Sequence, residues 1–146
     1  MSKEETKDLV RFLKVFPEDT VNTVLWLRDF VWDLYPNSNE LIYDNYNALA
    51  FGWSLTDRQT HLFCNIAVGR TNNSIQFGFY YGAELADPKK ILIGNGNQYR
   101  YLVVKNQAEF PRTYMKKLLK EAYSLSRGKV KDAALLSKGL TIVKSV

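Results

Sequence analysis

The feature that most constrains the fold is a long run of strand-forming sequence that contains no helical pattern. Residues with strand character, many of them alternating between apolar and polar, occupy 41–46, 49–55, 59–68, 74–81 and 98–105. Polar turns, or turns that contain glycine and proline, separate these segments. Antiparallel strands can be joined by such turns, whereas parallel strands need long crossover connections that are usually helical. We therefore expect one mainly antiparallel sheet of about five strands.

Helical patterns lie on both sides of this run. Apolar residues at helical spacing predict helices over 3–15, 18–35 and 111–126. Pro17 ends the first helix and Pro111 opens the last, because proline is tolerated at the first helical position. Two helices, then the strands, then one helix is the order of an α+β fold whose helices pack on one face of the sheet.

Large aromatic side chains are expected to fill the core. Aromatic residues make up 14% and hydrophobic residues 46% of the 146 residues, which suffices for the core of one domain. The strand alternation and the apolar stripe of the second helix place five rings inside: Trp32, Phe51, Trp53, Phe77 and Phe79. We assign residues 1–126 to this single domain.

Residues 127–146 form a basic tail. The tail holds five basic residues and one acid, so it carries four of the five net positive charges of the chain. A basic pI that arises from a tail is weak support for nucleic-acid binding. The tail also contains no aromatic ring on which a base could stack. We therefore do not expect a nucleic-acid partner.

The chain offers few residues for catalysis or metal binding. His61 is the only histidine and Cys64 the only cysteine. Strand alternation places the two on opposite faces, with Cys64 buried, so they do not form a catalytic couple. Acidic residues gather at 4–8 and 18–19, where the helix dipole explains them. We expect no catalytic residue, no metal site and no cofactor, and we keep His61 as a candidate polar site residue on a partly exposed strand.

A glycine-rich turn supplies the best candidate for a ligand site. Gly94 and Gly96 precede Arg100, and Lys89 and Lys90 lie a few residues earlier. The backbone N–H groups of such a turn, together with a guanidinium group, can hold an anion. We expect positive φ angles at both glycines.

Arg100 also has a structural interpretation. Alternation places it on the face of Leu102 and Val104, with Tyr99 and Tyr101 on the other face. An arginine beside aliphatic residues needs a partner, which is a carboxylate or carbonyl group in a structural role and an anionic ligand in a binding role. The candidate carboxylates are Asp44, Glu84 and Asp87.

The sequence predicts a cytoplasmic location. A single cysteine allows no disulfide within the chain. The polar, acidic N-terminus does not have the pattern of a signal peptide, and no segment has the length of a membrane span. We therefore expect no membrane partner.

The segment 77–105 resembles a known family. The stretch FGFYYGAELADP at 77–88 resembles the "gF-x-x-Ga-x-L-x-dP" signature of the YdhG-like proteins, catalogued as domain of unknown function 1801. The stretch LIGNGNQYR at 92–100 is similar to their "L-x-G-x-G-K-x-x-R" pattern, with Asn97 in place of the lysine. A proline of the family's "W-G-x-P-x-Y" region is missing from 43–48. The resemblance covers about residues 17–126 and implies an α+β fold with a sheet backed by helices.

Three hypotheses for function follow. The first is a non-enzymatic binding or adaptor domain that uses its aromatic sheet face or the turn at 94–100. The second, implied only by the resemblance, is a frataxin-like iron-binding chaperone, although the helices here have mixed charge and form no acidic ridge. The third is an enzyme or anion-binding protein that uses Arg100 or His61. The expected partner is a small ligand or another protein, and a homodimer stays open.

Overall fold

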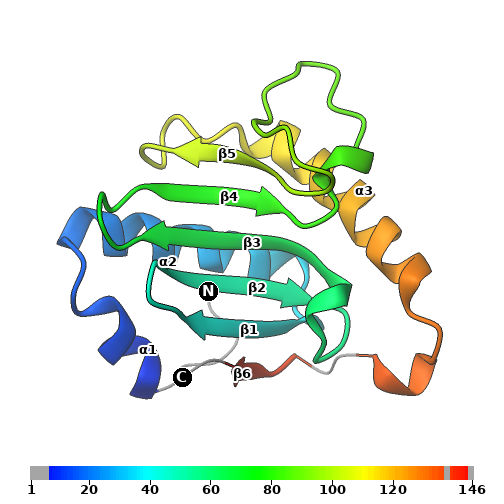
Figure 1. The fold of residues 1–146 in the computed structure, drawn as a ribbon, viewed down its shortest axis with the longest axis horizontal. Helices are drawn as coiled ribbons and strands as arrows, with labels where there is room; N and C mark the ends of the chain where they lie inside the picture. The colour runs from blue at the N-terminus through cyan, green and yellow to red at the C-terminus, as the bar shows by residue number, and fades with distance from the viewer. Residues whose placement is uncertain (1–6, 137–138, 145–146) are drawn as a thin grey trace.

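The structure is a computed structural model that describes residues 7–136 and 139–144. Within these residues it has an α+β fold, with three α-helices and a six-stranded sheet in the order β5-β4-β3-β2-β1-β6 (Figure 1). All neighbouring strands pair antiparallel except β1 and β6, which are parallel. The predicted fold class is thus confirmed.

The first five strands overlap the predicted strand segments, with bounds that differ by up to three residues. Their bounds are β1 Asn39–Asp44, β2 Ala48–Ser54, β3 Leu62–Gly69, β4 Ile75–Phe79 and β5 Arg100–Val104. The sixth strand, β6, spans Thr141–Val143 and was not predicted. It lies in the segment interpreted as a basic tail, and it pairs with β1 at the edge of the sheet.

The three helices also lie where helical spacing predicts them. They are α1 Lys7–Leu13, α2 Glu18–Leu34 and α3 Arg112–Lys129. Pro17 and Pro111 stand just before α2 and α3, as their N-cap residues. Residues 3–6 of the predicted first helix lie outside the described residues.

The core lies between the helices and one face of the sheet. Figure 1 views the sheet from its other face, with α2 behind it. Trp32 of α2 meets Trp53 of β2 edge to face, with ring centroids 6.2 Å apart. The rings predicted for the core are at most 1% exposed, which confirms all five: Trp32, Phe51, Trp53, Phe77 and Phe79.

A β-bulge at the start of β3 changes which side chains face the core. Cys64 lies opposite Trp53 and Leu62 lies opposite Ser54, so Phe63 is an extra residue in the ladder. Phe63 is 1% exposed and belongs to the core, whereas Leu62 lies on the open face. Strict alternation predicts Leu62 on the core face with Cys64, and Phe63 on the open face. That prediction is wrong because of the bulge.

A buried ion pair joins α2, β1 and β6. Arg28 Nε and Nη2 donate to the two carboxylate oxygens of Glu40 at 2.6 and 2.7 Å, and the two side chains are 1% and 0% exposed. Thr141 of β6 donates its hydroxyl to Glu40 Oε1 at 2.9 Å. The backbone N–H of Glu40 donates to the Leu140 carbonyl at 2.8 Å. The strand β6 therefore closes over a charged pair that would otherwise lie at the sheet edge.

Candidate functional site

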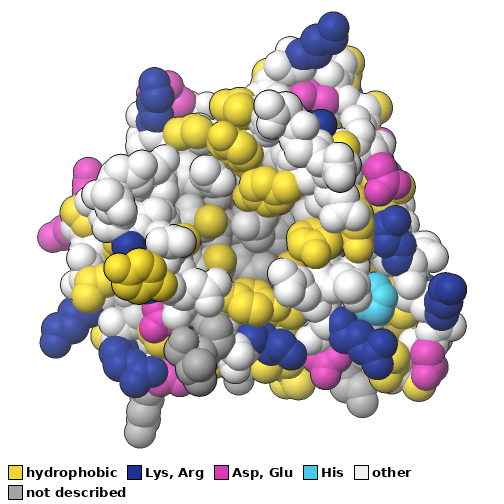
Figure 2. All heavy atoms as spheres, viewed as in Figure 1, with side chains coloured by type: hydrophobic (Ala, Val, Ile, Leu, Met, Phe, Trp, Pro, Cys, Tyr) yellow, Lys and Arg dark blue, Asp and Glu magenta, His cyan; other side chains and the backbone are white. Residues whose placement is uncertain are grey.

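The face of the sheet opposite the core is hollow because small residues line it. In β2, three small side chains alternate with the core residues Leu49, Phe51 and Trp53: Ala48, Ala50 and Gly52. Side chains of successive strand residues point to opposite faces, so this alternation puts bulk on the core side and leaves little on the other. Figure 2 views this face and shows a hollow at its centre with hydrophobic side chains around it.

The hollow contains a groove of about 340 Å³. No charged side chain lines it; tyrosines, carboxamides and small or apolar residues do. The lining residues are Tyr43, Asn45, Ala50, Gly52, Gln59, Leu62, Asn65, Tyr80, Gln98 and Tyr99. A pocket with aromatic walls and a few polar groups is the usual form of a small-molecule site.

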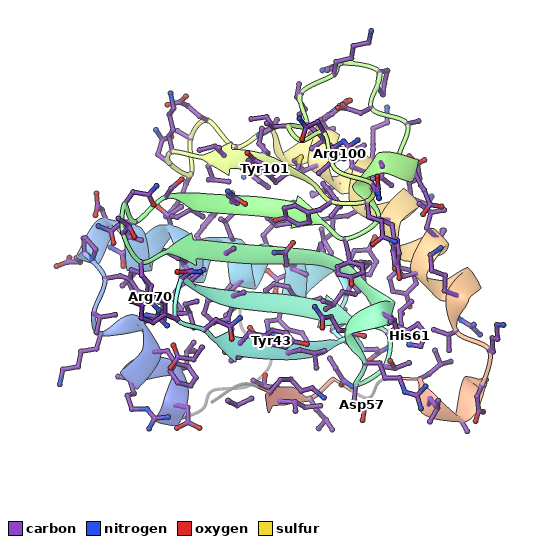
Figure 3. The ribbon with its side chains drawn as sticks, viewed as in Figure 1. Tyr43, Asp57, His61, Arg70, Arg100 and Tyr101 are labelled. Carbon is purple, nitrogen blue, oxygen red and sulfur yellow. The ribbon has the colours of Figure 1, made fainter. Side chains whose placement is uncertain are left out.

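Tyrosines form the walls of the groove. Tyr43 belongs to β1, whereas Tyr80 follows β4 and Tyr99 precedes β5. Tyr99 stacks on Tyr101 with ring centroids 5.8 Å apart and an interplanar angle of 22°. Figure 3 labels Tyr43 and Tyr101 on the two sides of the open face. The aromatic rings therefore approach the groove from both flanks of the sheet.

Glycine at position 78 allows Tyr99 to lie across β4. A Cβ atom on Gly78 would overlap the Tyr99 hydroxyl and would lie 2.6 Å from Asn65 Oδ1. The Asn65 carboxamide hydrogen-bonds the same tyrosine hydroxyl. Gly78 thus makes space for a tyrosine–asparagine contact in the wall of the groove.

Two polar atoms at the groove have no hydrogen-bond partner. Among the described residues, Tyr43 Oη and Asn65 Oδ1 are buried without one; the other two such atoms, on Trp32 and Trp53, belong to core residues. An unsatisfied buried donor or acceptor costs about 1–3 kcal/mol. Such groups call for a partner, which either water or a bound ligand in the groove can supply.

The groove holds neutral hydroxyl groups at ordinary pH. Burial raises the pKa of Tyr43, and the nearby Tyr80 raises it further. Burial also raises the pKa of Tyr99, against the opposing effect of the Asn65 hydrogen bond. Tyrosines whose pKa lies above the usual value stay protonated, so they donate and accept hydrogen bonds but do not act as bases near neutrality. In this form the two phenols can donate hydrogen bonds to a neighbouring acceptor.

The predicted anion site has a different geometry from the one expected. Arg100 Nη1 donates to the carbonyl oxygens of Gly96 and Tyr99, both at 2.8 Å. The guanidinium thus binds carbonyl groups of the turn itself. Gly94 has the expected positive φ of 131°, whereas Gly96 does not have one, so that part of the prediction is wrong.

None of the carboxylates considered as partners reaches Arg100 within the described chain. Asp44 pairs with Arg70, Asp87 accepts from the Tyr114 hydroxyl, and Glu84 lies 3.7 Å from Lys129.

The two lysines do not join Arg100 either. Lys89 Nζ lies over the Tyr114 ring, 5.0 Å from its centroid. Lys90 adopts a φ of 53° and closes a turn by donating its N–H to the Asp87 carbonyl at 2.9 Å.

His61 is not on a strand. It ends a short 3₁₀ turn, Gln59–His61, is 9% exposed, and its Nδ1 lies 2.8 Å from Thr56 Oγ1. The prediction of a partly exposed strand histidine is therefore wrong, since the turn before the bulge directs the ring inward. Cys64 is a free, fully buried thiol as predicted, and burial raises its pKa well above the usual value.

The described residues contain no group of three or more histidine, cysteine, aspartate or glutamate side chains that could hold a metal ion. Of the predicted acidic clusters, Glu4 and Glu5 lie outside the described residues, and Asp8 pairs with Arg11 at 2.8 Å. Over the same described ranges, no helix combines the length and the apolar character that crossing a membrane requires.

Sequence reasoning missed Tyr43, Asn65, Tyr80 and Tyr99 as site residues. The signal that identifies them is the row of small residues on the side of β2, β3 and β4 away from the core, namely Ala48, Ala50, Gly52, Ala67 and Gly78. Such a row predicts a hollow, and the polar residues beside it are its lining. No protein-family model, curated protein or solved structure matches this chain.

Proposed function

We propose that this chain is a non-enzymatic binding protein for a small, uncharged ligand that lies in the open-face groove. The observation that carries the proposal is the pair of buried polar atoms, Tyr43 Oη and Asn65 Oδ1, that lack partners at the edge of an uncharged, tyrosine-walled groove. A ligand with its own donor and acceptor groups would satisfy both.

The lining sets the chemical class of the ligand. Carboxamides donate and accept hydrogen bonds at fixed geometry, and tyrosine rings present flat apolar faces. A charged ligand would lose its hydration without gaining a counter-charge, which is costly. The groove therefore suits a neutral molecule with a flat face and several hydrogen-bonding groups, a description that fits both a nucleobase and a pyranose sugar.

Two other functions have less support from the geometry. An anion site at the turn would use the Arg100 guanidinium, which already donates to two carbonyl groups. An iron-binding chaperone, suggested only by the resemblance to YdhG-like proteins, would use clustered oxygen ligands, and the described residues contain no such cluster. An enzyme that relies on a carboxylate, histidine or thiol as its base or nucleophile is less well supported, because none of these groups lines the groove.

A ligand panel tests the proposal. We expect neutral nucleosides or neutral sugars to raise the melting temperature and to give saturable calorimetric binding, and whichever class binds identifies the ligand. Their phosphorylated counterparts should bind more weakly. If no member of either neutral class binds, or if the phosphorylated members bind best, the proposal is wrong.

A matched pair of variants tests whether the ligand binds in the groove. Ala50 lines the groove, whereas Ala48 lies on the same face of β2 but outside it. Ala50→Leu should fill the groove and abolish binding, and Ala48→Leu should leave binding intact. Equal binding by both variants would show that the ligand lies elsewhere.

A further inference from the structure

The outer side of β5 is an incompletely paired sheet edge. In the described residues, β5 pairs with β4 on one side and has only the isolated bridge from Ile93 to Tyr101 on the other. Tyr101 exchanges both backbone hydrogen bonds with Ile93, at 3.0 and 2.7 Å. Backbone groups of a strand alternate in direction, so the N–H and C=O of Val103, two residues on, point outward in the same way. Val103 is 39% exposed.

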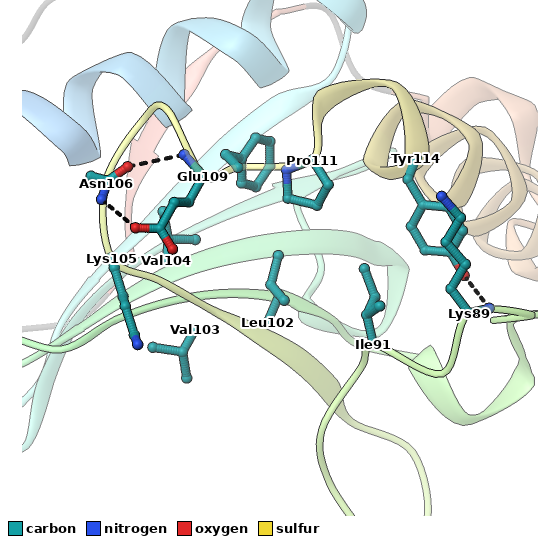
Figure 4. Close-up of a pocket in the computed structure, with 11 residues that line it drawn as sticks. Lys89, Ile91, Leu102, Val103, Val104, Lys105, Asn106, Glu109, Pro111 and Tyr114 are labelled. Atoms are coloured by element: carbon teal, nitrogen blue, oxygen red, sulfur yellow. Dashed lines mark hydrogen bonds between the residues drawn. The ribbon is translucent and has the colours of Figure 1, made fainter.

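A pocket of about 280 Å³ lies beside this edge, between β5 and the start of α3. Leu102 and Val104 line it from β5, and Phe110 and Pro111 line it from the segment that leads into α3. Figure 4 shows Leu102 and Ile91 facing Pro111 across it. A strand laid along β5 would direct every second side chain toward this apolar pocket.

A lysine side chain lies at each end of the pocket. Figure 4 shows Lys105 at one end and Lys89 at the other. Glu109 is the only acid in the lining, and its carboxylate accepts a hydrogen bond from Asn106 at 2.8 Å. Lysines at an exposed edge disfavour pairing with a second copy of the same chain, and they favour an acidic segment.

We propose that the β5 edge is a docking site for an extended peptide of another protein, with an aliphatic residue flanked by acidic residues. The peptide adds a strand beside Val103, its aliphatic side chain enters the pocket, and its carboxylates lie near Lys89 and Lys105. Backbone pairing supplies affinity, and the pocket and lysines supply specificity, as in strand addition generally. This site shares no lining residue with the open-face groove.

The test is fluorescence polarisation with a labelled Asp-Asp-Val-Ile-Val-Asp-Asp peptide and the full chain. Val103→Pro removes the outward N–H without removing a bond to β4, and proline is tolerated at sheet edges. We expect it to weaken binding by up to about tenfold, the effect of losing one backbone hydrogen bond. Val103→Ala keeps the N–H and is the matched control. Equal affinity of these two variants would overturn the proposal.

Charge reversal provides a second, independent readout. Lys89→Glu with Lys105→Glu should lose the acidic peptide and gain a Lys-Lys-Val-Ile-Val-Lys-Lys peptide, whereas Ala50→Leu in the groove should change neither. Unchanged preference in the charge-reversed variant would overturn the proposal. Concentration-dependent dimerisation that Val103→Pro abolishes would reassign the edge to self-association.

Discussion

At the scale of single residues, Tyr99 both makes contacts within the sheet and lines the open-face groove. Its ring stacks on Tyr101, its hydroxyl contacts Asn65, and it lines the groove. Gly78 is the residue that leaves room for it. Neighbours within the sheet thus hold the Tyr99 ring and the Asn65 carboxamide in place, as the proposed binding function requires.

Because Tyr99 is partly buried, we expect the free energy of unfolding to fall as the pH becomes alkaline. Burial, with smaller contributions from Tyr101 and Cys64, raises its pKa above the ordinary value of 10.0 against the Asn65 hydrogen bond. A group whose pKa is raised on folding stabilises the fold fully below its unfolded pKa, and this contribution is lost as the pH rises through the folded pKa. Denaturation measured at increasing pH should show less alkaline loss of stability in Tyr99→Phe than in the unchanged chain.

Tyr46→Phe is the control for this measurement, because Tyr46 is 93% exposed. It should leave the alkaline loss of stability as it is in the unchanged chain. Equal pH profiles for Tyr99→Phe and the unchanged chain would show that burial does not hold the Tyr99 hydroxyl in its neutral form.

Sequence alone predicts core residues well where alternation is regular. Phe77 and Phe79 follow a regular strand and are buried as expected. Leu62 and Phe63 lie where the alternation is interrupted. A bulge inserts one residue there, so side chains before Cys64 point to the opposite face from the one that alternation predicts. A bulge depends on the pairing of two strands, so the sequence of one strand does not reveal it.

At the scale of elements, the joint between α2, β1 and β6 depends on the Arg28–Glu40 pair. Breaking a buried pair by removing one partner leaves an uncompensated charge and costs about 3–5 kcal/mol. Arg28→Met should therefore lower the free energy of unfolding by that amount, measured by urea denaturation. The double variant Arg28→Met with Glu40→Leu should recover much of the loss, since no buried charge remains.

The exposed pair Arg11–Asp8 offers a matched control, with side chains 68% and 47% exposed. Arg11→Met should change stability by less than about 1 kcal/mol, because surface ion pairs are weak. Similar losses for Arg28→Met and Arg11→Met would contradict a buried structural role for Arg28.

The elements themselves differ in how far sequence predicts them. Helices α2 and α3 and strands β1–β5 have enough residues for a periodic pattern to be recognised. Strand β6 has only Thr141, Ile142 and Val143, which is too short for alternation to be detected. Its pairing partner, β1, lies far away in the sequence, so only the folded arrangement reveals it.

At the scale of the whole molecule, the layer order could be predicted and the groove could not. A run of strands with helices at its ends implies one covered and one open face. The depth of the open face depends on which small residues of β2, β3 and β4 line up side by side, as Gly52 lies beside Asn65 and Asn65 beside Gly78. That register is set by the bulge and the turns between strands, which the sequence alone did not determine.

The absence of tight iron binding is a prediction that concerns the whole chain. The iron-chaperone hypothesis rests on the resemblance of 77–105 to YdhG-like proteins, and the described residues contain no cluster of suitable ligands. Anaerobic calorimetry with ferrous iron should therefore show no one-to-one binding of micromolar affinity. Titration of iron into buffer provides the baseline. A clear one-to-one isotherm would favour the chaperone hypothesis over the ligand-binding one.

The position of β6 affects how the sheet is completed during synthesis. Thr141 lies 101 residues after Glu40, the residue to which it donates its hydrogen bond. At translation rates of about 5–20 residues per second, roughly 5–20 s separate the synthesis of these two segments. During that interval the backbone of β1 and the Glu40 carboxylate lack the partners that β6 and the Leu140 carbonyl supply in the complete fold. Completion of the sheet at β1 therefore waits for one of the last segments of the chain to be made.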